Sequence, residues 1–198
     1  MYNGLSNSTR KTYLGIANGR ITHKPGRDME PQTYEQVDGT IKGIERRDAE
    51  INGSKMKIYD INLVDNQGEV AVLSVIADGG VARGLVMALV NIPDMGKPVR
   101  IRAYSQDRNG RAYTSTVVYQ NGEKVPWIKP MNELPKGEAV MVNGKPFVLN
   151  GVAQYDYSAR NAEIDGYVDA INEACLKVSN DNAPQVEFED VTDMPSDI

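Results

Sequence analysis

The dipeptide Asn-Gly occurs seven times in this chain of 198 residues. Asn and Gly both tolerate a positive φ, so the pair is the preferred centre of the type I′ turn that joins two antiparallel strands. Asn66-Gln67-Gly68 makes a similar turn. Tight turns that recur about every 10–15 residues predict a meander of short strands. The five pairs that lie between β-prone stretches are Asn18-Gly19, Asn52-Gly53, Asn109-Gly110, Asn121-Gly122 and Asn143-Gly144.

Hydrophobic periodicity places strands and two helices between these turns. The run Val70–Ala77 is apolar on both faces, which predicts a central strand. Apolar residues at helical spacing predict helices over 80–91, and over 158–178 with Ser158 as N-cap and an apolar stripe of Ile164, Val168, Ile171, Cys175 and Val178. Strands are expected at 12–17, 20–24, 36–46, 54–64, 69–77, 98–106, 111–119, 123–128, 139–142 and 146–149.

The elements from 36 to 128 therefore run as three strands, a helix and at least two further strands. This is the order of the five-stranded OB barrel, and Gly39 and Gly43 in its first strand predict a bulge or a barrel corner. Another small barrel or sandwich with one crossover helix fits the same pattern. The expected organisation is a mainly β chain with an N-terminal hairpin (1–30), an OB-like barrel (31–130), a hairpin plus a C-terminal helix (131–178) and a disordered acidic tail (179–198).

Charge is unevenly distributed along the chain, whose net charge is −5. Residues 179–198 hold six acids and no base, whereas residues 97–129 hold seven bases and two acids, and residues 10–27 hold five bases and no acid. Such segregation predicts a cationic surface on the folded body and a separate acidic appendage.

Residues 97–129 are the best candidate for a binding surface, because single-strand binders combine cations for phosphates with rings on which bases stack. A solvated sheet face is the alternative explanation. A second groove wall is expected at the loop between the first two barrel strands, which could equally be a solvated hairpin. The nucleic-acid-binding candidates are Arg46, Arg47, Lys55, Lys57, Tyr59, Arg100, Arg102, Tyr104, Arg108, Arg111, Tyr113, Tyr119 and Trp127.

Other functional classes find little support in the sequence. His23 is the single histidine, so no catalytic triad, Cys–His pair or histidine-rich metal site can form. The loop Asp78–Gly84 lacks the spacing of a phosphate-binding motif. We therefore expect neither catalytic residues, nor a metal, nor a cofactor. The lone Cys175 gives no internal disulfide, and with no apolar span or signal peptide we expect a cytoplasmic protein that does not contact membranes.

The strand order over 36–128, together with the tail 187–198, resembles a single-stranded DNA-binding protein of the bacteriophage or bacterial type. The resemblance implies single-stranded DNA as ligand in replication or recombination, and replication or repair proteins as partners of the acidic tail. Asp193, Pro195, Asp197 and Ile198 match the partner-binding tail loosely, because the family tail usually ends in Phe. Self-association stays open.

A protein-binding or structural β-barrel adaptor without nucleic-acid binding explains the hairpins and the ten tyrosines equally well. It does not explain the charge segregation. A module that binds double-stranded or structured RNA differs only in the shape of its ligand.

Overall fold

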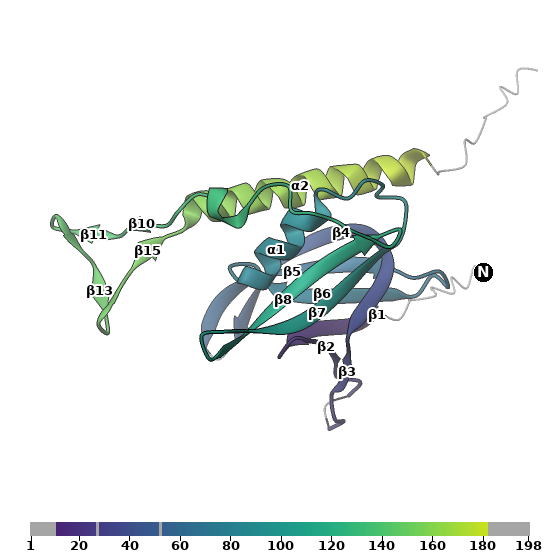
Figure 1. Ribbon diagram of the computed structural model, residues 1–198, viewed down its shortest axis with the longest axis horizontal. Coiled ribbons are helices and arrows are strands. Elements are labelled where there is room, and N and C mark those ends of the chain that lie inside the picture. The colour runs from purple at the N-terminus through teal and green to yellow at the C-terminus, as the bar shows by residue number, and fades with distance from the viewer. Residues whose placement is uncertain (1–10, 27, 52, 182–198) are drawn as a thin grey trace, which may run out of the picture.

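The computed structural model describes residues 11–26, 28–51 and 53–181 (Figure 1). The protein is mainly β, with two α-helices. Nine strands form one curled sheet in the order β3-β2-β1-β6-β5-β4-β7-β8-β9. They are β1 (Lys11–Ala17), β2 (Arg20–His23), β3 (Gln32–Tyr34), β4 (Gln36–Ile51), β5 (Ser54–Val64), β6 (Val70–Ile76), β7 (Val99–Arg108), β8 (Arg111–Gln120) and β9 (Glu123–Lys124).

Four of the five predicted Asn-Gly turns form, at Asn18, Asn109, Asn121 and Asn143, and a further one forms at Asn150-Gly151, whereas Asn52 lies outside the described residues. In these five turns the Asn has a φ between 50° and 56° and the following Gly a φ between 72° and 82°, the two positive values of a type I′ turn. The prediction of a central strand at Val70–Ala77 is also confirmed, because β6 lies between β1 and β5. The strand predicted over 123–128 is shorter, since only β9 pairs with β8.

The predicted order of three strands, a helix and two strands is present as β4-β5-β6-α1-β7-β8. The closed five-stranded barrel is wrong. β4 pairs with both β5 and β7, but β6 pairs in parallel with β1, and β3 and β9 end the sheet. The N-terminal hairpin therefore pairs with the edge of β6 that β5 leaves free, and it belongs to the main sheet. Its turn reaches the β7–β8 hairpin, where the Gly19 amide donates to Thr114 Oγ1 at 3.1 Å.

The bulge predicted in the first barrel strand occurs at Gly43. The β4–β5 register shifts between Ile41 and Gly43, and Gly43 has a φ of +142°. Beyond the shift Ile44 is in register with Ile61 of β5, whereas β7 pairs with β4 only over Gln36–Gly39. At Ile44 the backbone of β4 bonds to a side chain of the C-terminal helix: Asn172 Oδ1 accepts from Ile44 N at 2.7 Å and Asn172 Nδ2 donates to Ile44 O at 3.0 Å. The irregular point of the strand is thus a docking point for that helix.

Two helices cover the core. Helix α1 (Gly80–Leu89) is almost entirely buried, and α2 (Ser158–Asp181) runs across β4 with the predicted stripe inward, Ile164, Val168, Ile171 and Cys175 being buried (Figure 1). Ser158 is not the N-cap: it is the first helical residue, and its amide donates to Asp156 Oδ1 at 2.8 Å. Within the described residues, neither helix is long and apolar enough to cross a membrane.

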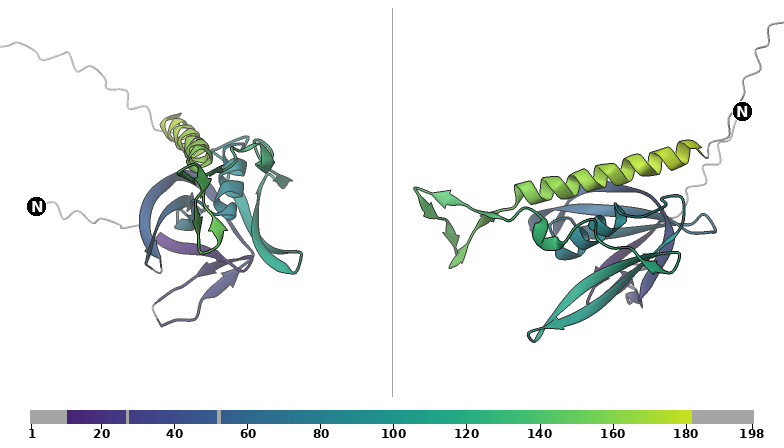
Figure 2. Two further views of the ribbon diagram at one scale, coloured as in Figure 1. Left: turned by 90° about the vertical axis from the view of Figure 1, so that its left-hand side faces the viewer. Right: turned by 45° about the horizontal axis from the view of Figure 1, so that its top comes forward.

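Residues 138–157 form an arm that projects beyond the sheet (Figure 2). The two strands predicted here are each split, and the arm holds three ladders of two residues per strand. They are β10 (Glu138–Ala139) with β15 (Tyr155–Asp156), β11 (Met141–Val142) with β12 (Lys145–Pro146), and β13 (Val148–Leu149) with β14 (Val152–Ala153). A short 3₁₀ helix, η1 (Met131–Glu133), precedes the arm, and Leu134 beside it is buried in the main core.

Candidate nucleic-acid interface

The strand register brings Arg100, Tyr119 and Lys124 side by side on three adjacent strands. Arg100 on β7 is opposite Tyr119 on β8, and Tyr119 is opposite Lys124 on β9. Directly opposed residues of antiparallel strands point to the same face of a sheet. Because Val99, Ile101 and Val118 are buried on the other face, the three side chains lie on the outer surface.

The same face continues along the β7–β8 hairpin. Arg102 and Tyr104 follow Arg100 at a spacing of two, and Tyr113 is on β8 opposite Gln106. The predicted sharing of a face by Arg100, Arg102 and Tyr104 fits this register. We call Arg100, Arg102, Tyr104, Tyr113, Tyr119 and Lys124 the Arg–Tyr face.

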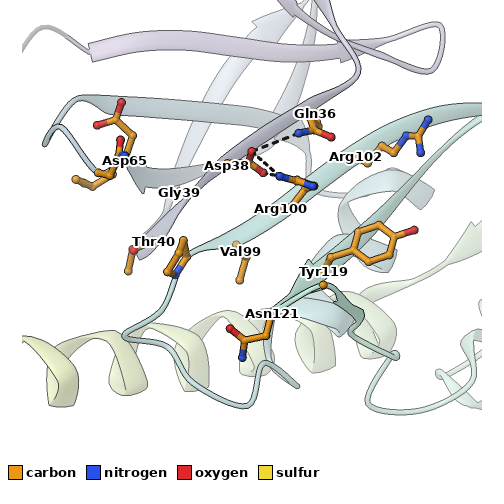
Figure 3. Close-up of a pocket in the computed structure, with 14 residues that line it drawn as sticks. Gln36, Asp38, Gly39, Thr40, Asp65, Val99, Arg100, Arg102, Tyr119 and Asn121 are labelled. Atoms are coloured by element: carbon orange, nitrogen blue, oxygen red, sulfur yellow. Dashed lines mark hydrogen bonds and ion pairs between the residues drawn. The ribbon is translucent and has the colours of Figure 1, made fainter.

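Two hollows flank β8. A pocket of about 760 Å³ contains Arg100, Arg102 and Tyr119 beside the edge of β4 (Figure 3). A second pocket of about 470 Å³ contains Tyr104, Lys124, Lys129 and Trp127. Both pockets therefore contain cations and aromatic rings, and the first also contains the carboxylates of Asp38 and Asp65.

Trp127 forms the wall of the second pocket against α1. A Cβ added at Gly84 would lie 3.4 Å from the Trp127 ring, so the ring packs closely on the helix where a side chain is absent. The indole is nevertheless 45% exposed. One side of the ring is thus fixed, while the exposed part is available to a stacking ligand.

The cations of the Arg–Tyr face have acidic neighbours that the sequence did not reveal. Arg100 Nε donates to Asp38 Oδ1 at 2.8 Å and Arg100 Nη2 to Asp38 Oδ2 at 3.2 Å (Figure 3). The hydrogen bond to Asp38 raises the pKa of Arg100. Arg102 pairs with Glu35 at 3.5 Å, and Glu35 also accepts from Arg20 at 2.8 Å. All of these pairs are exposed, and exposed ion pairs exchange readily with other charged partners.

The predicted second wall has a different arrangement. Arg46, Lys57 and Tyr59 converge on Asp165 of α2, with N···O distances of 3.1 Å for each cation and 2.8 Å from the Tyr59 hydroxyl. Tyr59 is only 2% exposed, so the prediction that its ring lines an open groove is wrong. The acidic helix occupies the inner face of this hairpin.

The remaining predicted residues are dispersed. Arg47 lies on the opposite face of β4 from Arg46, and its Nε donates to buried Asp60 at 2.5 Å. Lys55 is exposed near the tip of the β4–β5 hairpin, and Arg111 is exposed beside the Asn109-Gly110 turn, where it pairs in register with Arg108. Tyr113 is 47% exposed.

Lys124 is the residue of the interface that the sequence prediction missed. A signal for it existed: a two-residue Asn121-Gly122 turn pairs Gln120 with Glu123 and therefore Tyr119 with Lys124. No comparable signal pointed to Asp38 or Glu35, because their partners are more than 60 residues away in the sequence.

Among residues 11–26, 28–51 and 53–181, no group of His, Cys, Asp or Glu side chains could hold a metal ion. His23 Nδ1 lies 3.0 Å from the carbonyl of Tyr13. The predicted tail residues Asp193, Pro195, Asp197 and Ile198 lie outside the described residues.

No protein-family model matches the chain, and no curated protein matches it. One solved structure found by comparison is the OB domain of a protein from Thermoplasma acidophilum, determined by solution NMR. It is 18% identical, and the match covers 50% of this chain and 83% of that one with a TM-score of 0.25. At this TM-score nothing about fold or function is carried over from that domain.

Proposed function

We propose that the Arg–Tyr face binds single-stranded nucleic acid, with DNA in replication or recombination as the first candidate. The observation that carries the proposal is the cross-strand row Arg100–Tyr119–Lys124, in which a ring lies between two cations on an exposed sheet face. A single strand presents the same alternation, because its phosphates need cations and its unpaired bases stack on rings.

The two pockets extend this row in both directions across β8. Tyr119 lies in the pocket with Arg100 and Arg102, while Tyr104 and Trp127 lie in the pocket with Lys124. A strand that crosses β8 would meet rings on both sides of it. Recognition through stacking and phosphates implies little base preference and a steep dependence on salt.

Asp38 and Glu35 tune this binding. They neutralise Arg100 and Arg102 in the free protein, and a phosphate must replace them. The carboxylates therefore lower the affinity of the Arg–Tyr face for phosphate. The acidic tail at 187–198, which resembles a partner-recruiting segment, would compete for the same cations.

The test is fluorescence anisotropy of a labelled oligo-dT with the full chain at two salt concentrations. Arg100→Ala, Arg102→Ala, Tyr104→Ala and Tyr119→Ala should each weaken binding at low salt without altering the far-UV circular dichroism. Loss of a stacking ring typically costs about 1–3 kcal/mol per base. Lys177→Ala is the matched control, since it removes an exposed cation from α2.

The adaptor hypothesis remains as the second candidate, and the exposed apolar side chains of the arm favour a protein contact. If the wild-type chain does not bind oligo-dT at low salt, or if Lys177→Ala weakens binding as much as Arg100→Ala, the Arg–Tyr face is not a nucleic-acid site.

A further inference from the structure

We propose that the arm, residues 138–157, joins two copies of this chain by arm-to-arm contact. This inference does not depend on nucleic-acid binding. The backbone of the arm is regular although the arm has no core of its own.

The regularity comes from a seven-residue repeat. Residues 141–147 (Met-Val-Asn-Gly-Lys-Pro-Phe) and 148–154 (Val-Leu-Asn-Gly-Val-Ala-Gln) each form a two-residue ladder closed by an Asn-Gly turn. The residues at the joints bond to one another in a ring: Phe147 N to Val140 O at 2.7 Å, Gln154 N to Phe147 O at 2.9 Å, and Val140 N to Gln154 O at 2.9 Å. Two hairpins and the β10–β15 ladder thus meet at a three-way junction.

The junction buries almost nothing. Every residue from 141 to 152 is exposed. The large apolar side chains among them are 40–63% exposed, namely Met141, Val142, Phe147, Val148, Leu149 and Val152. An isolated two-stranded hairpin is at best marginally stable in water, and an ordered structure needs a third strand or a packed apolar face. The missing apolar contacts must come from another surface.

The chain's own body does not supply that surface, because the arm points away from the sheet in the views of Figures 1 and 2. The apolar side chains of the tip expose on the order of 600 Å² in total. This area is divided between the two faces of the arm, because adjacent residues of a strand point to opposite sides.

The composition of the tip favours a second copy of this chain as the partner that covers it. Between Val140 and Gln154 the only charged residue is Lys145. Interfaces between identical subunits are more apolar and poorer in charge than those between different proteins, and a two-fold contact requires only that the surface match itself. A largely apolar surface with a single charge is suited to such a contact, whereas it offers little to select a charged partner.

The test is sedimentation velocity of the full chain between about 1 and 100 μM, a range in which weak dimers dissociate. The wild type should sediment as a dimer at the upper end. Leu149→Lys should raise the dissociation constant at least about tenfold, because it places a charge in the centre of an apolar contact. Leu176→Lys is the matched control: it makes the same change at a leucine of α2 that is 64% exposed, compared with 53% for Leu149.

A dimer that is lost in Leu149→Lys and kept in Leu176→Lys, with unchanged thermal unfolding of both variants, supports the proposal. A wild type that stays monomeric throughout the range overturns it and leaves the tip for a different partner. Equal dissociation of both variants, or a dimer that survives Leu149→Lys, also overturns it, because the contact would then lie elsewhere.

Discussion

Asn172 of α2 takes the place of a neighbouring strand for the backbone of Ile44. Its side-chain amide accepts from the Ile44 N–H at 2.7 Å and donates to the Ile44 carbonyl at 3.0 Å, beyond Gly39, where the pairing of β4 with β7 ends. One side chain therefore satisfies both backbone polar groups of a residue next to the Gly43 bulge and fixes the helix to the sheet.

Asn172→Ala should lower the free energy of unfolding by about 1–3 kcal/mol, because it leaves a partly buried N–H and C=O without their partners. Urea denaturation followed by circular dichroism measures the loss. Glu173→Ala, on the exposed face of the same helix turn, should cost far less. If Asn172→Ala and Glu173→Ala have the same free energy of unfolding, the hydrogen bonds of Asn172 to Ile44 do not stabilise the packing of α2 on the sheet.

The stability of the α2 contact should depend on acid pH through Asp165. Burial raises the pKa of this carboxyl. Hydrogen bonds from Tyr59 and Lys57 and the charges of Lys57 and Arg46 together lower the pKa by more than burial raises it, so the pKa is below the ordinary value. A lowered pKa contributes stability above the unfolded-state pKa of about 3.9, and this stability is lost as pH falls through the folded-state value.

The free energy of unfolding should therefore fall as pH is lowered through and below the ordinary aspartate range, and Asp165→Asn should flatten that slope. Denaturation curves at a series of acid pH values give both slopes. Asp48→Asn, at an exposed position of β4, is the control. If the free energy of unfolding depends on pH equally in the wild type and in Asp165→Asn, the Asp165 carboxyl does not cause the loss of stability in acid.

Gly19→Ala should destabilise the chain more than Gly110→Ala. Both glycines follow an Asn in a type I′ turn, with φ of +72° and +74°, so the left-handed conformation costs either alanine about 1–2 kcal/mol. A Cβ at Gly19 would lie 2.3 Å from the backbone N of Ser105, whereas at Gly110 no described atom lies within 4 Å.

The difference between the two melting temperatures isolates the steric contact of the N-terminal turn with β7, since the conformational term is shared. Equal melting temperatures would mean that the turn is not seated on β7.

Asp38→Asn should increase the affinity for oligo-dT several-fold at low salt. The substitution removes the charge that pairs with Arg100 and leaves the guanidinium to contact phosphate. Anisotropy titrations compare it with Asp48→Asn, which removes the same charge from the distal end of β4. The gain should disappear at high salt, where screening weakens both interactions. An equal gain from both variants would reflect net charge alone.

Local rules were sufficient for the hairpins and the helices. The positive φ of Asn18 and Gly19 follows from the chemistry of these two residues, and the inward stripe of α2 follows from its periodicity, so neither needs a distant partner. The face shared by Arg100, Arg102 and Tyr104 follows in the same way, because side chains alternate along a strand.

The sequence by itself therefore determined where the chain turns and which side of β7 faces outward. Only the tertiary structure decided which strand β6 meets at its free edge, that Tyr59 and Arg46 bind α2, and that Asp38 pairs with Arg100. Each of these is a pairing between segments far apart in the chain, and its free energy depends on the positions of both partners, which no local pattern contains.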